Sequence, residues 1–167
     1  SAQDKNDSIT IIGCGGFIGS HLIDRLLATT SRRITGIDLV SDKIAGHLGN
    51  DRLTFKKIDM HDAVSLRPHI EQGGTVILLA ALCNPALYNT RAIDVIDVNC
   101  TGTIPLVKMA AEAGTRLVYF STSEVYGRTA ASLAGRSGNV LSEEKSPFIL
   151  GPVSAQRWSY ACAKQLV

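Results

Sequence analysis

The segment Ser8–Ser20 constrains the fold of this chain more than any other. It reads S-I-T-I-I-G-C-G-G-F-I-G-S, an apolar run that ends at Gly13, with further glycines at Gly16 and Gly19. The run is typical of a buried parallel strand, and the glycines allow a tight turn, close approach of the backbone to a ligand and close packing of the next helix. The start of that helix offers free N–H groups and a positive dipole end to a pyrophosphate. Because a glycine triplet alone is a weak motif, the rest of the chain has to support this interpretation.

The composition limits the chain to one ordinary domain. With 45% hydrophobic residues the chain can bury one hydrophobic core, and its length of 167 residues is too short for two ordinary domains. We expect residues 8–167 to form this domain. Residues 1–7 are polar and do not begin with Met, so we expect a disordered, processed or trimmed tail there.

Charge, hydropathy and cysteine spacing argue against a nucleic-acid partner, a membrane partner and a metal site. The formal net charge of +2 includes no basic block, so we expect no nucleic-acid partner. No apolar run reaches transmembrane length and no signal-peptide pattern is present, so we expect a cytoplasmic protein that binds no membrane. The four cysteines lack paired spacing, which predicts reduced thiols and no metal site.

Strand-like and helical patterns alternate after the first glycines. Apolar residues recur at helical spacing at Phe17, Leu22, Ile23, Leu26 and Leu27. A second helix is predicted over Ala63–Ile70. Strands are predicted at Arg33–Leu39, Leu53–Ile58, Thr75–Leu79 and Arg116–Ser121.

The helical pattern over Arg91–Ala113 is interrupted by Gly102 and Pro105. A proline inside a helix removes one backbone hydrogen bond and clashes with the preceding turn. We therefore expect a kink or a restart near residues 101–105, with Asn99 just ahead of it.

An acidic residue stands where a nucleotide-binding fold needs one. Asp38 ends the second predicted strand, nineteen residues after Gly19. A carboxylate there accepts hydrogen bonds from both hydroxyls of an adenosine ribose and repels a 2′-phosphate, which favours NAD over NADP. Arg32 and Arg33 nearby keep NADP open.

Two further strand ends carry candidate cofactor contacts. After the third predicted strand, Asp59 is placed to accept a hydrogen bond from the adenine amino group, and Met60 is placed to cover the adenine ring. The segment has a second interpretation, in which Asp62 caps the helix that follows. After the fourth strand, Ala80 and Ala81 are small enough to let the backbone pass under a flat cofactor.

Tyr160 and Lys164 carry the strongest chemical signal. They stand four residues apart, so on a helix they share one face and act on the same bound molecule. A free phenol has a pKa of about 10, and lowering it to about 7 takes roughly 4 kcal/mol of differential stabilisation. A nearby ammonium and a nicotinamide cation would supply this, and tyrosinate would then take a hydroxyl proton as hydride leaves for NAD.

These features together resemble the extended short-chain dehydrogenase/reductases that act on nucleotide sugars, the NAD-dependent epimerase/dehydratase family. The matching motifs are Gly13–Gly19, Asp38, Asp59, Leu79-Ala80-Ala81, Asn99, Ser121–Gly127 (S-T-S-E-V-Y-G) and Tyr160-x-x-x-Lys164. The resemblance implies that NAD is held by Gly13, Gly16, Phe17, Ile18, Gly19, Asp38, Asp59, Met60, Ala80, Ala81, Asn99, Tyr160 and Lys164. The implied fold is a doubly wound parallel α/β sheet of Rossmann type in order 3-2-1-4-5.

Residues 83–91, 121–127 and 151–166 resemble more narrowly the branch that decarboxylates UDP-glucuronate. This branch includes UDP-apiose/UDP-xylose synthases and the decarboxylase of the aminoarabinose pathway. The resemblance implies oxidation at sugar C4 by NAD, followed by loss of the C6 carboxylate as CO2. Candidate catalytic residues besides Tyr160 and Lys164 are Cys83, Ser123 or its neighbour Thr122, and Glu124, and candidate substrate contacts are Tyr88 and Arg157.

Two departures from this pattern matter. Apiose-forming relatives are expected to carry a second cysteine where this chain has Ser123, so decarboxylation is predicted more firmly than ring contraction. The chain also stops at Val167, before the substrate domain of such relatives, so we expect a truncated, inactive piece. The implied partners are a UDP-sugar and a second copy of the chain. Two alternatives stay open: a nucleotide-sugar 4-epimerase or 4,6-dehydratase, and a non-catalytic NAD sensor or scaffold.

Overall fold

The computed structural model describes residues 7–128, 134–135 and 141–167, so the predicted tail lies almost wholly outside the described residues. Contacts divide the chain into two compact units. Unit 1 comprises Ser1–Ala81 and Thr101–Phe120, and unit 2 comprises Leu82–Cys100 and Ser121–Val167.

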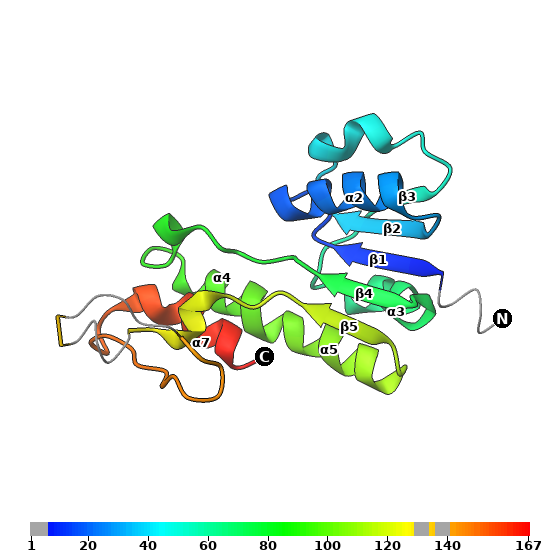
Figure 1. The fold of residues 1–167 in the computed structure, drawn as a ribbon. Coiled ribbons are helices and arrows are strands. Elements are labelled where there is room, and N and C mark those ends of the chain that lie inside the picture. Colours follow the sequence, from blue (N-terminus) through cyan, green and yellow to red (C-terminus); the bar gives the residue numbers. More distant parts are fainter. Residues whose placement is uncertain (1–6, 129–133, 136–140) are drawn as a thin grey trace. The chain divides into compact units, whose positions relative to one another are not determined.

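Unit 1 is built on a five-stranded parallel sheet in the order β3-β2-β1-β4-β5, as the sequence predicted (Figure 1). The strands are β1 (Ser8–Ile12), β2 (Arg33–Asp38), β3 (Leu53–Lys57), β4 (Thr75–Leu78) and β5 (Arg116–Tyr119). Each bound lies within two residues of the predicted one. The predicted Rossmann-type fold class is therefore confirmed.

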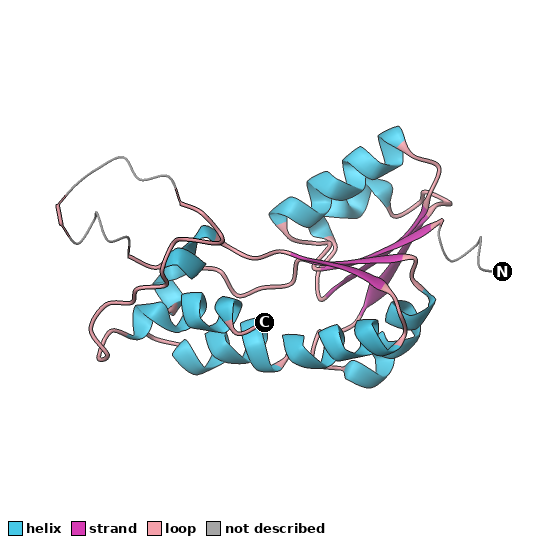
Figure 2. Ribbon diagram, turned by 60° about the horizontal axis from the view of Figure 1, so that its bottom comes forward, coloured by secondary structure: helices cyan, strands magenta, loops and turns pink. Residues whose placement is uncertain are grey.

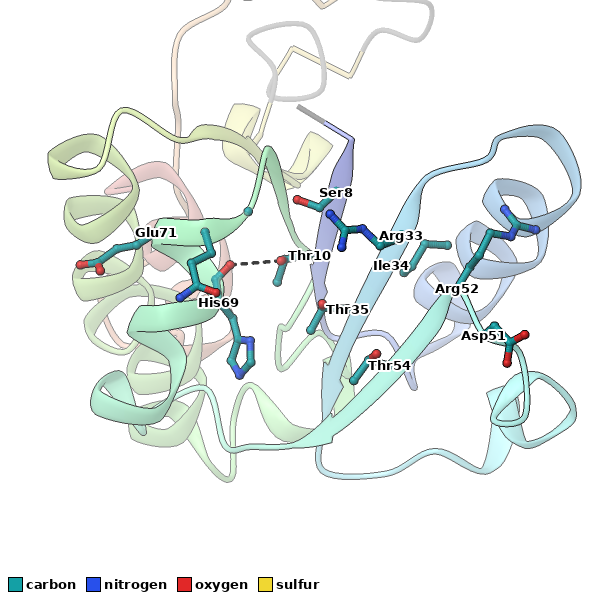
Figure 3. A pocket seen from close by; sticks show the side chains of 12 residues that line it. Ser8, Thr10, Arg33, Ile34, Thr35, Asp51, Arg52, Thr54, His69 and Glu71 are labelled. Atoms are coloured by element: carbon teal, nitrogen blue, oxygen red, sulfur yellow. Dashed lines mark hydrogen bonds between the residues drawn. The ribbon is translucent and has the colours of Figure 1, made fainter. Parts of the chain in front are cut away.

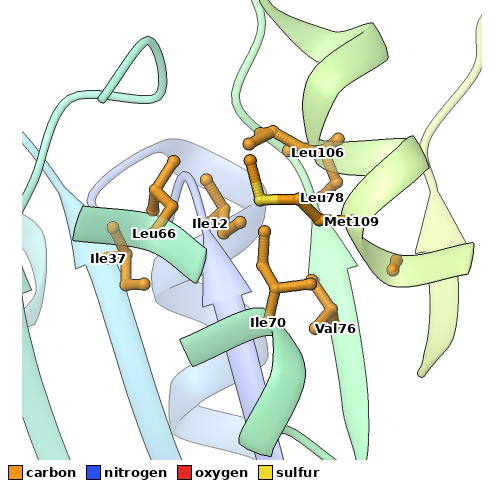
Figure 4. Packing of buried hydrophobic residues seen from close by; sticks show 9 residues of the cluster. Ile12, Ile37, Leu66, Ile70, Val76, Leu78, Leu106 and Met109 are labelled. Atoms are coloured by element: carbon orange, nitrogen blue, oxygen red, sulfur yellow. The ribbon is translucent and has the colours of Figure 1, made fainter. Parts of the chain in front are cut away.

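Helices cover both faces of this sheet (Figure 2). They are α2 (Phe17–Thr29), the short 3-10 helix η1 (Asp42–His47), α3 (Ala63–Gln72) and α5 (Thr103–Glu112). One core cluster packs α3 and α5 against Ile12, Ile37, Val76 and Leu78, and a second packs α2 and η1 against the opposite face (Figure 4). Because each fully buried Ile or Leu contributes about 1.5–3 kcal/mol, these clusters hold the strand ends in place.

The buried face of α2 differs from the predicted one at its first residue. Ile23 and Leu27 are buried as expected, but the Phe17 side chain is 72% exposed. Phe17 is the first residue of α2, directly after the Gly16 N-cap, and its ring packs edge-on against His21 instead of entering the core cluster of α2. Its inclusion in the apolar face was therefore wrong.

Unit 2 contains short helices and irregular segments. They are η2 (Pro85–Leu87), α4 (Ala92–Ile96), the π-helical turn η3 (Asp97–Thr101), η4 (Ser123–Tyr126), η5 (Gln156–Trp158) and α7 (Ser159–Gln165). The predicted interruption near residues 101–105 is confirmed, because η3 ends at Thr101 and α5 begins at Thr103. Pro105 then lies in the first turn of α5, where its missing N–H has no intrahelical acceptor to lose.

Candidate functional site

The turn between β1 and α2 requires glycine at three positions, of which Gly13 and Gly19 were predicted. Gly13 has a φ of +95°, and a Cβ there would lie 2.5 Å from the backbone nitrogen of Ala80. A Cβ on Gly19 would lie 2.3 Å from the carbonyl oxygen of Gly13, so this glycine lets α2 pack on the turn. Gly16 is different: a Cβ there would meet only the Gly13 oxygen, at 3.4 Å. The chain itself therefore leaves room at Gly16, on the outer side of the turn.

The N-terminus of α2 is suited to an anion. Gly16 is the N-cap and supplies no side-chain cap, and no acidic residue lies in the first turn. The first N–H groups of a helix have no intrahelical acceptor. Phe17 and Ile18, the first two residues of α2, are 72% and 52% exposed, so this end of the helix is open to solvent. This geometry fits the pyrophosphate predicted for the loop.

Asp38 organises the backbone around this turn. Its Oδ2 accepts from the Gly15 N–H at 2.8 Å, and its Oδ1 accepts from the N–H groups of Leu39 and Val40 at 2.7 and 3.2 Å. A Cβ on Gly15 would lie 2.2 Å from the Val40 carbonyl oxygen, so this glycine is required as well. Gly15 was not predicted as a site residue, although it lies in the G-C-G-G run. The ribose role of Asp38 stays a prediction.

The acidic residues after β3 have local partners. Asp59 accepts from the backbone N–H and the ring Nδ1 of His61, both at 2.9 Å, and these hydrogen bonds lower the pKa of its carboxyl. Asp62 accepts from the Ser65 N–H at 3.1 Å, which confirms its role as the cap of α3. Met60 and Ala80 pack partly against the α3–α5 cluster. Their predicted cofactor contacts stay predictions.

In unit 2, Tyr160 and Lys164 are both buried on α7, at 7% and 4% exposed. Tyr160 packs with Tyr88 and Val95 in a small apolar cluster to which Leu82 also contributes. Burial raises the pKa of Tyr160, with smaller electrostatic contributions from Cys83 and Glu124, while a side-chain hydrogen bond with Thr122 lowers it. Burial lowers the pKa of Lys164 to about 8, opposed by Cys83.

The structure brings Thr122, rather than Ser123, to Tyr160. The Thr122 Oγ1 accepts from the Glu124 N–H at 3.2 Å, which leaves its own proton for the Tyr160 oxygen. Ser123 is exposed. Thr122 is the extended N-cap of η4, whereas Ser123 is the first residue of this 3-10 helix, and the sequence carries no signal that separates the two.

Tyr88 and Tyr160 also feel the charges of neighbouring side chains, which come from Cys83, Glu124 and Arg157. Burial raises the pKa of Tyr88, with further contributions from the charges of Glu124, Tyr160 and Cys83, and Arg157 opposes them. Cys83 is exposed, and Nη2 of Arg157 lies 3.8 Å from Oε2 of Glu124. The predicted catalytic and substrate residues of unit 2 thus share one electrostatic environment.

Asn99 lies inside unit 2 and holds its backbone. It is fully buried, and its Nδ2 donates to the carbonyl oxygens of Leu82 at 2.9 Å and Val95 at 2.8 Å. These bonds join the π-helical turn to the segment that leads to Cys83. This is a structural role, which the predicted cofactor role did not include.

A cavity of about 470 Å³ lies elsewhere in unit 1 (Figure 3). Thr10, Thr35 and Thr54 stand side by side on it in the strand register of β1, β2 and β3. Arg33 and His69 also line it. None of the residues predicted to hold NAD or to take part in catalysis lines it, so the cavity is separate from the candidate site.

Within the described ranges, no group of three or more His, Cys, Asp or Glu residues is arranged to hold a metal ion. All four cysteines lie in these ranges and are free thiols. None of the helices that the structure describes is long and apolar enough to cross a membrane.

Comparisons with known proteins agree with this geometry. The UDP-D-apiose/UDP-D-xylose synthase 1 of Arabidopsis thaliana is 41% identical over 174 residues, which cover 96% of this chain and 45% of that protein. The crystal structure of the PbgP3 protein from Burkholderia pseudomallei is 31% identical with a TM-score of 0.87, and covers 96% of this chain and 46% of that one. The structure of MoeE5 in complex with UDP-glucuronic acid and NAD is 26% identical with a TM-score of 0.72, over 95% of this chain and 46% of that one.

The chain thus spans about half the length of the relatives it matches. The family model of the NAD dependent epimerase/dehydratase family matches residues 9–167, nearly the whole chain. The predicted cofactor, NAD, agrees with this match. The glycine turn, the buried Tyr160–Lys164 pair and these likenesses together show that the chain belongs to the NAD-dependent epimerase/dehydratase family.

Proposed function

We propose that this chain is the cofactor-binding part of an NAD-dependent enzyme that oxidises UDP-glucuronate at C4 and releases its C6 carboxylate as CO2. The observation that carries the proposal is the buried Tyr160–Lys164 pair with the Thr122 hydroxyl on the tyrosine. The name of the Arabidopsis relative and the ligands of MoeE5 support the substrate class.

The residues of unit 1 fit NAD. The uncapped start of α2 and the open side of Gly16 suit the pyrophosphate, and Asp38 at the end of β2 suits the adenosine ribose. Asp59, Met60, Ala80 and Ala81 are the further proposed contacts. NAD supplies the hydride acceptor for oxidation of the sugar and a positive nicotinamide ring.

The reacting groups belong to unit 2. Tyr160 takes the proton of the C4 hydroxyl, and Thr122 donates a hydrogen bond to the oxygen that becomes the ketone. Because the pKa of Tyr160 is raised in this structure, a positive charge has to lower it before it acts as a base. Lys164 holds the nicotinamide ribose and contributes such a charge when it is protonated.

Loss of CO2 then follows from the 4-ketone, which accepts the electron pair of the broken C–C bond. Glu124 positions the carboxylate end of the sugar or relays a proton to the carbon that lost CO2. Arg157 and Tyr88 are proposed to contact the sugar. Cys83 stands near Tyr160, but Ser123 occupies the position of the second expected cysteine, so the proposed product is an unbranched UDP-pentose or UDP-4-keto-pentose rather than the ring-contracted pentose of UDP-apiose.

The test is release of labelled CO2 from UDP-glucuronate carrying ¹⁴C at C6, with NAD present, by protein that contains this chain. Tyr160→Phe should abolish release because phenylalanine cannot take the proton. Epimerised or dehydrated sugar nucleotide without CO2 would establish the alternative enzyme class instead. Bound NAD without turnover of any sugar nucleotide would establish the sensor class.

We further propose that the protein is a cytoplasmic homodimer that pairs through α4 and α7. Ile93 on α4 is 81% exposed and Ile96 on the same helix is 40% exposed, so this helix offers apolar surface to a second copy. Ile93→Glu should convert a dimer into a monomer in sedimentation experiments. Exposed Val64 on α3 provides the matched control, since Val64→Glu should leave the dimer intact.

A further inference from the structure

Arg157 and Trp158 make a contact that the sequence did not predict. The guanidinium carbon of Arg157 lies 4.5 Å from the ring centroid of Trp158. A cation over the face of an indole is attracted by the ring quadrupole. Both residues belong to η5, which runs directly into α7, so the contact is made next to the helix that carries Tyr160 and Lys164.

The same guanidinium stands beside Glu124. Nη2 of Arg157 lies 3.8 Å from Oε2 of Glu124, a separation that allows Coulombic attraction but is too long for a hydrogen bond. This Oε2 is buried and has no hydrogen bond with any residue that the structure describes. Because buried acceptors in proteins are normally hydrogen-bonded, the atom is placed to receive a donor from a ligand.

Gly151 provides the place for the indole. A Cβ at Gly151 would lie 2.5 Å from Nε1 and 3.1 Å from Cε2 of Trp158. Any larger residue would displace the ring, and with it the surface on which Arg157 lies. The contacts therefore run from Gly151 through Trp158 and Arg157 to Glu124, all within unit 2.

We infer that Trp158 is a positioning residue for substrate recognition: it fixes Arg157 beside Glu124 so that the guanidinium receives the carboxylate of a uronate substrate. A guanidinium carries five N–H donors, and the Arg157 side chain is 45% exposed, so donors remain for a carboxylate while one edge faces Glu124. The unused Oε2 of Glu124 then accepts from a hydroxyl of the same ligand. The substrate class rests on the proposed function.

The test measures equilibrium binding of UDP-glucuronate and UDP-glucose, which differ only in the carboxylate, to protein that contains this chain. Trp158→Ala and Arg157→Gln should each weaken binding of UDP-glucuronate about tenfold and change that of UDP-glucose by less than about twofold. The double variant should bind UDP-glucuronate no more weakly than Arg157→Gln, since Trp158 acts through Arg157. Additive losses, or equal losses for both ligands, would overturn the inference.

Two conservative variants separate positioning from folding. Trp158→Phe retains an aromatic face and should keep most of the affinity, whereas Gly151→Ala should lose as much as Trp158→Ala while the indole is still present. Gly49→Ala is the matched control, because a Cβ there meets nothing within 4 Å, and it should bind both ligands as the parent does. If Trp158→Ala does not fold, normal UDP-glucuronate binding by Gly151→Ala would overturn the inference.

Trp158 is the single tryptophan of the chain, so its fluorescence reports on this contact directly. UDP-glucuronate should change its emission in the parent protein and not in Arg157→Gln. This result is independent of CO2 release: a carboxylate preference that depends on Trp158 without CO2 would reject the proposed reaction alone, and CO2 release with normal binding by Trp158→Ala would reject this inference alone.

Discussion

The rings of Tyr88 and Tyr160 stack with their centroids 5.1 Å apart and their planes 12° from parallel. Both are buried, at 2% and 7% exposed. Tyr88 directly follows η2 and Tyr160 lies on α7, so the stack fixes the segment after Cys83 against the helix that carries the proposed base. The orientation of Tyr160 is thus set by packing as well as by its hydrogen bond with Thr122.

Tyr88→Ala should lower the free energy of unfolding by about 3–5 kcal/mol, because it removes a buried ring and its stacking partner. Tyr88→Phe keeps the ring and should cost less than about 1.5 kcal/mol. Urea unfolding followed by circular dichroism measures both. Equal losses for the two variants would show that the hydroxyl, and not the stack, carries the stability.

Lys164 predicts a stability that rises at alkaline pH. Burial lowers its pKa from 10.5 to about 8, so between these values the unfolded chain binds the proton that the folded chain has released. The free energy of unfolding therefore rises with pH across this window and reaches its full gain above the unfolded pKa. Since one pKa unit corresponds to about 1.4 kcal/mol, the gain is on the order of 3 kcal/mol.

The raised pKa values of Tyr160 and Cys14 act in the opposite direction, so the contribution of Lys164 is isolated as a difference between proteins. Lys164→Met should remove the rise that is specific to Lys164. Lys108→Met, at an exposed position of α5, should retain it. Identical pH curves for the parent and Lys164→Met would contradict the prediction.

Replacing Gly13 and Gly16 by alanine should have different effects, the first on stability and the second on the binding of NAD. Gly13→Ala places a Cβ against the Ala80 backbone at a positive φ and should destabilise unit 1 by about 2 kcal/mol or more. Gly16→Ala has an allowed backbone and room for the methyl group, so it should cost less than about 1 kcal/mol. Gly16→Ala should instead weaken the binding of NAD, because the added methyl group stands where the pyrophosphate is proposed to approach.

Thermal unfolding measures the stability of the Gly13→Ala and Gly16→Ala proteins, and titration with NAD measures their affinity for the cofactor. A Gly16→Ala protein that binds NAD as the parent does would remove Gly16 from the cofactor site. A Gly13→Ala protein as stable as the parent would show that the turn relaxes around the added methyl group.

The strands, their order and the glycine turn could be predicted because they depend on local patterns. Apolar runs that end in glycine or Asp, and alternation with helical spacing, leave few arrangements for a parallel sheet. The choice of Thr122 over Ser123 and the Arg157–Glu124 approach could not be predicted. They depend on how separate segments meet in unit 2, and the sequence spacing carries no information on that contact. The exposure of Phe17 was missed as well, because helical spacing shows which face of a helix is apolar and not which residues of that face are covered.

The four thiols predict a large spread of reactivity. Cys14 is fully buried, and burial and the Asp38 charge raise its pKa to about 12, so its thiolate fraction at pH 8 is about one in ten thousand. Cys100 is also buried, Cys162 is half-buried and Cys83 is exposed. A disulfide reagent such as DTNB should therefore modify one thiol quickly in the native protein. Cys83→Ser should remove this fast phase and Cys14→Ser should leave it unchanged, and a fast phase that survives Cys83→Ser would show that the segment after Ala81 is packed differently from this structure.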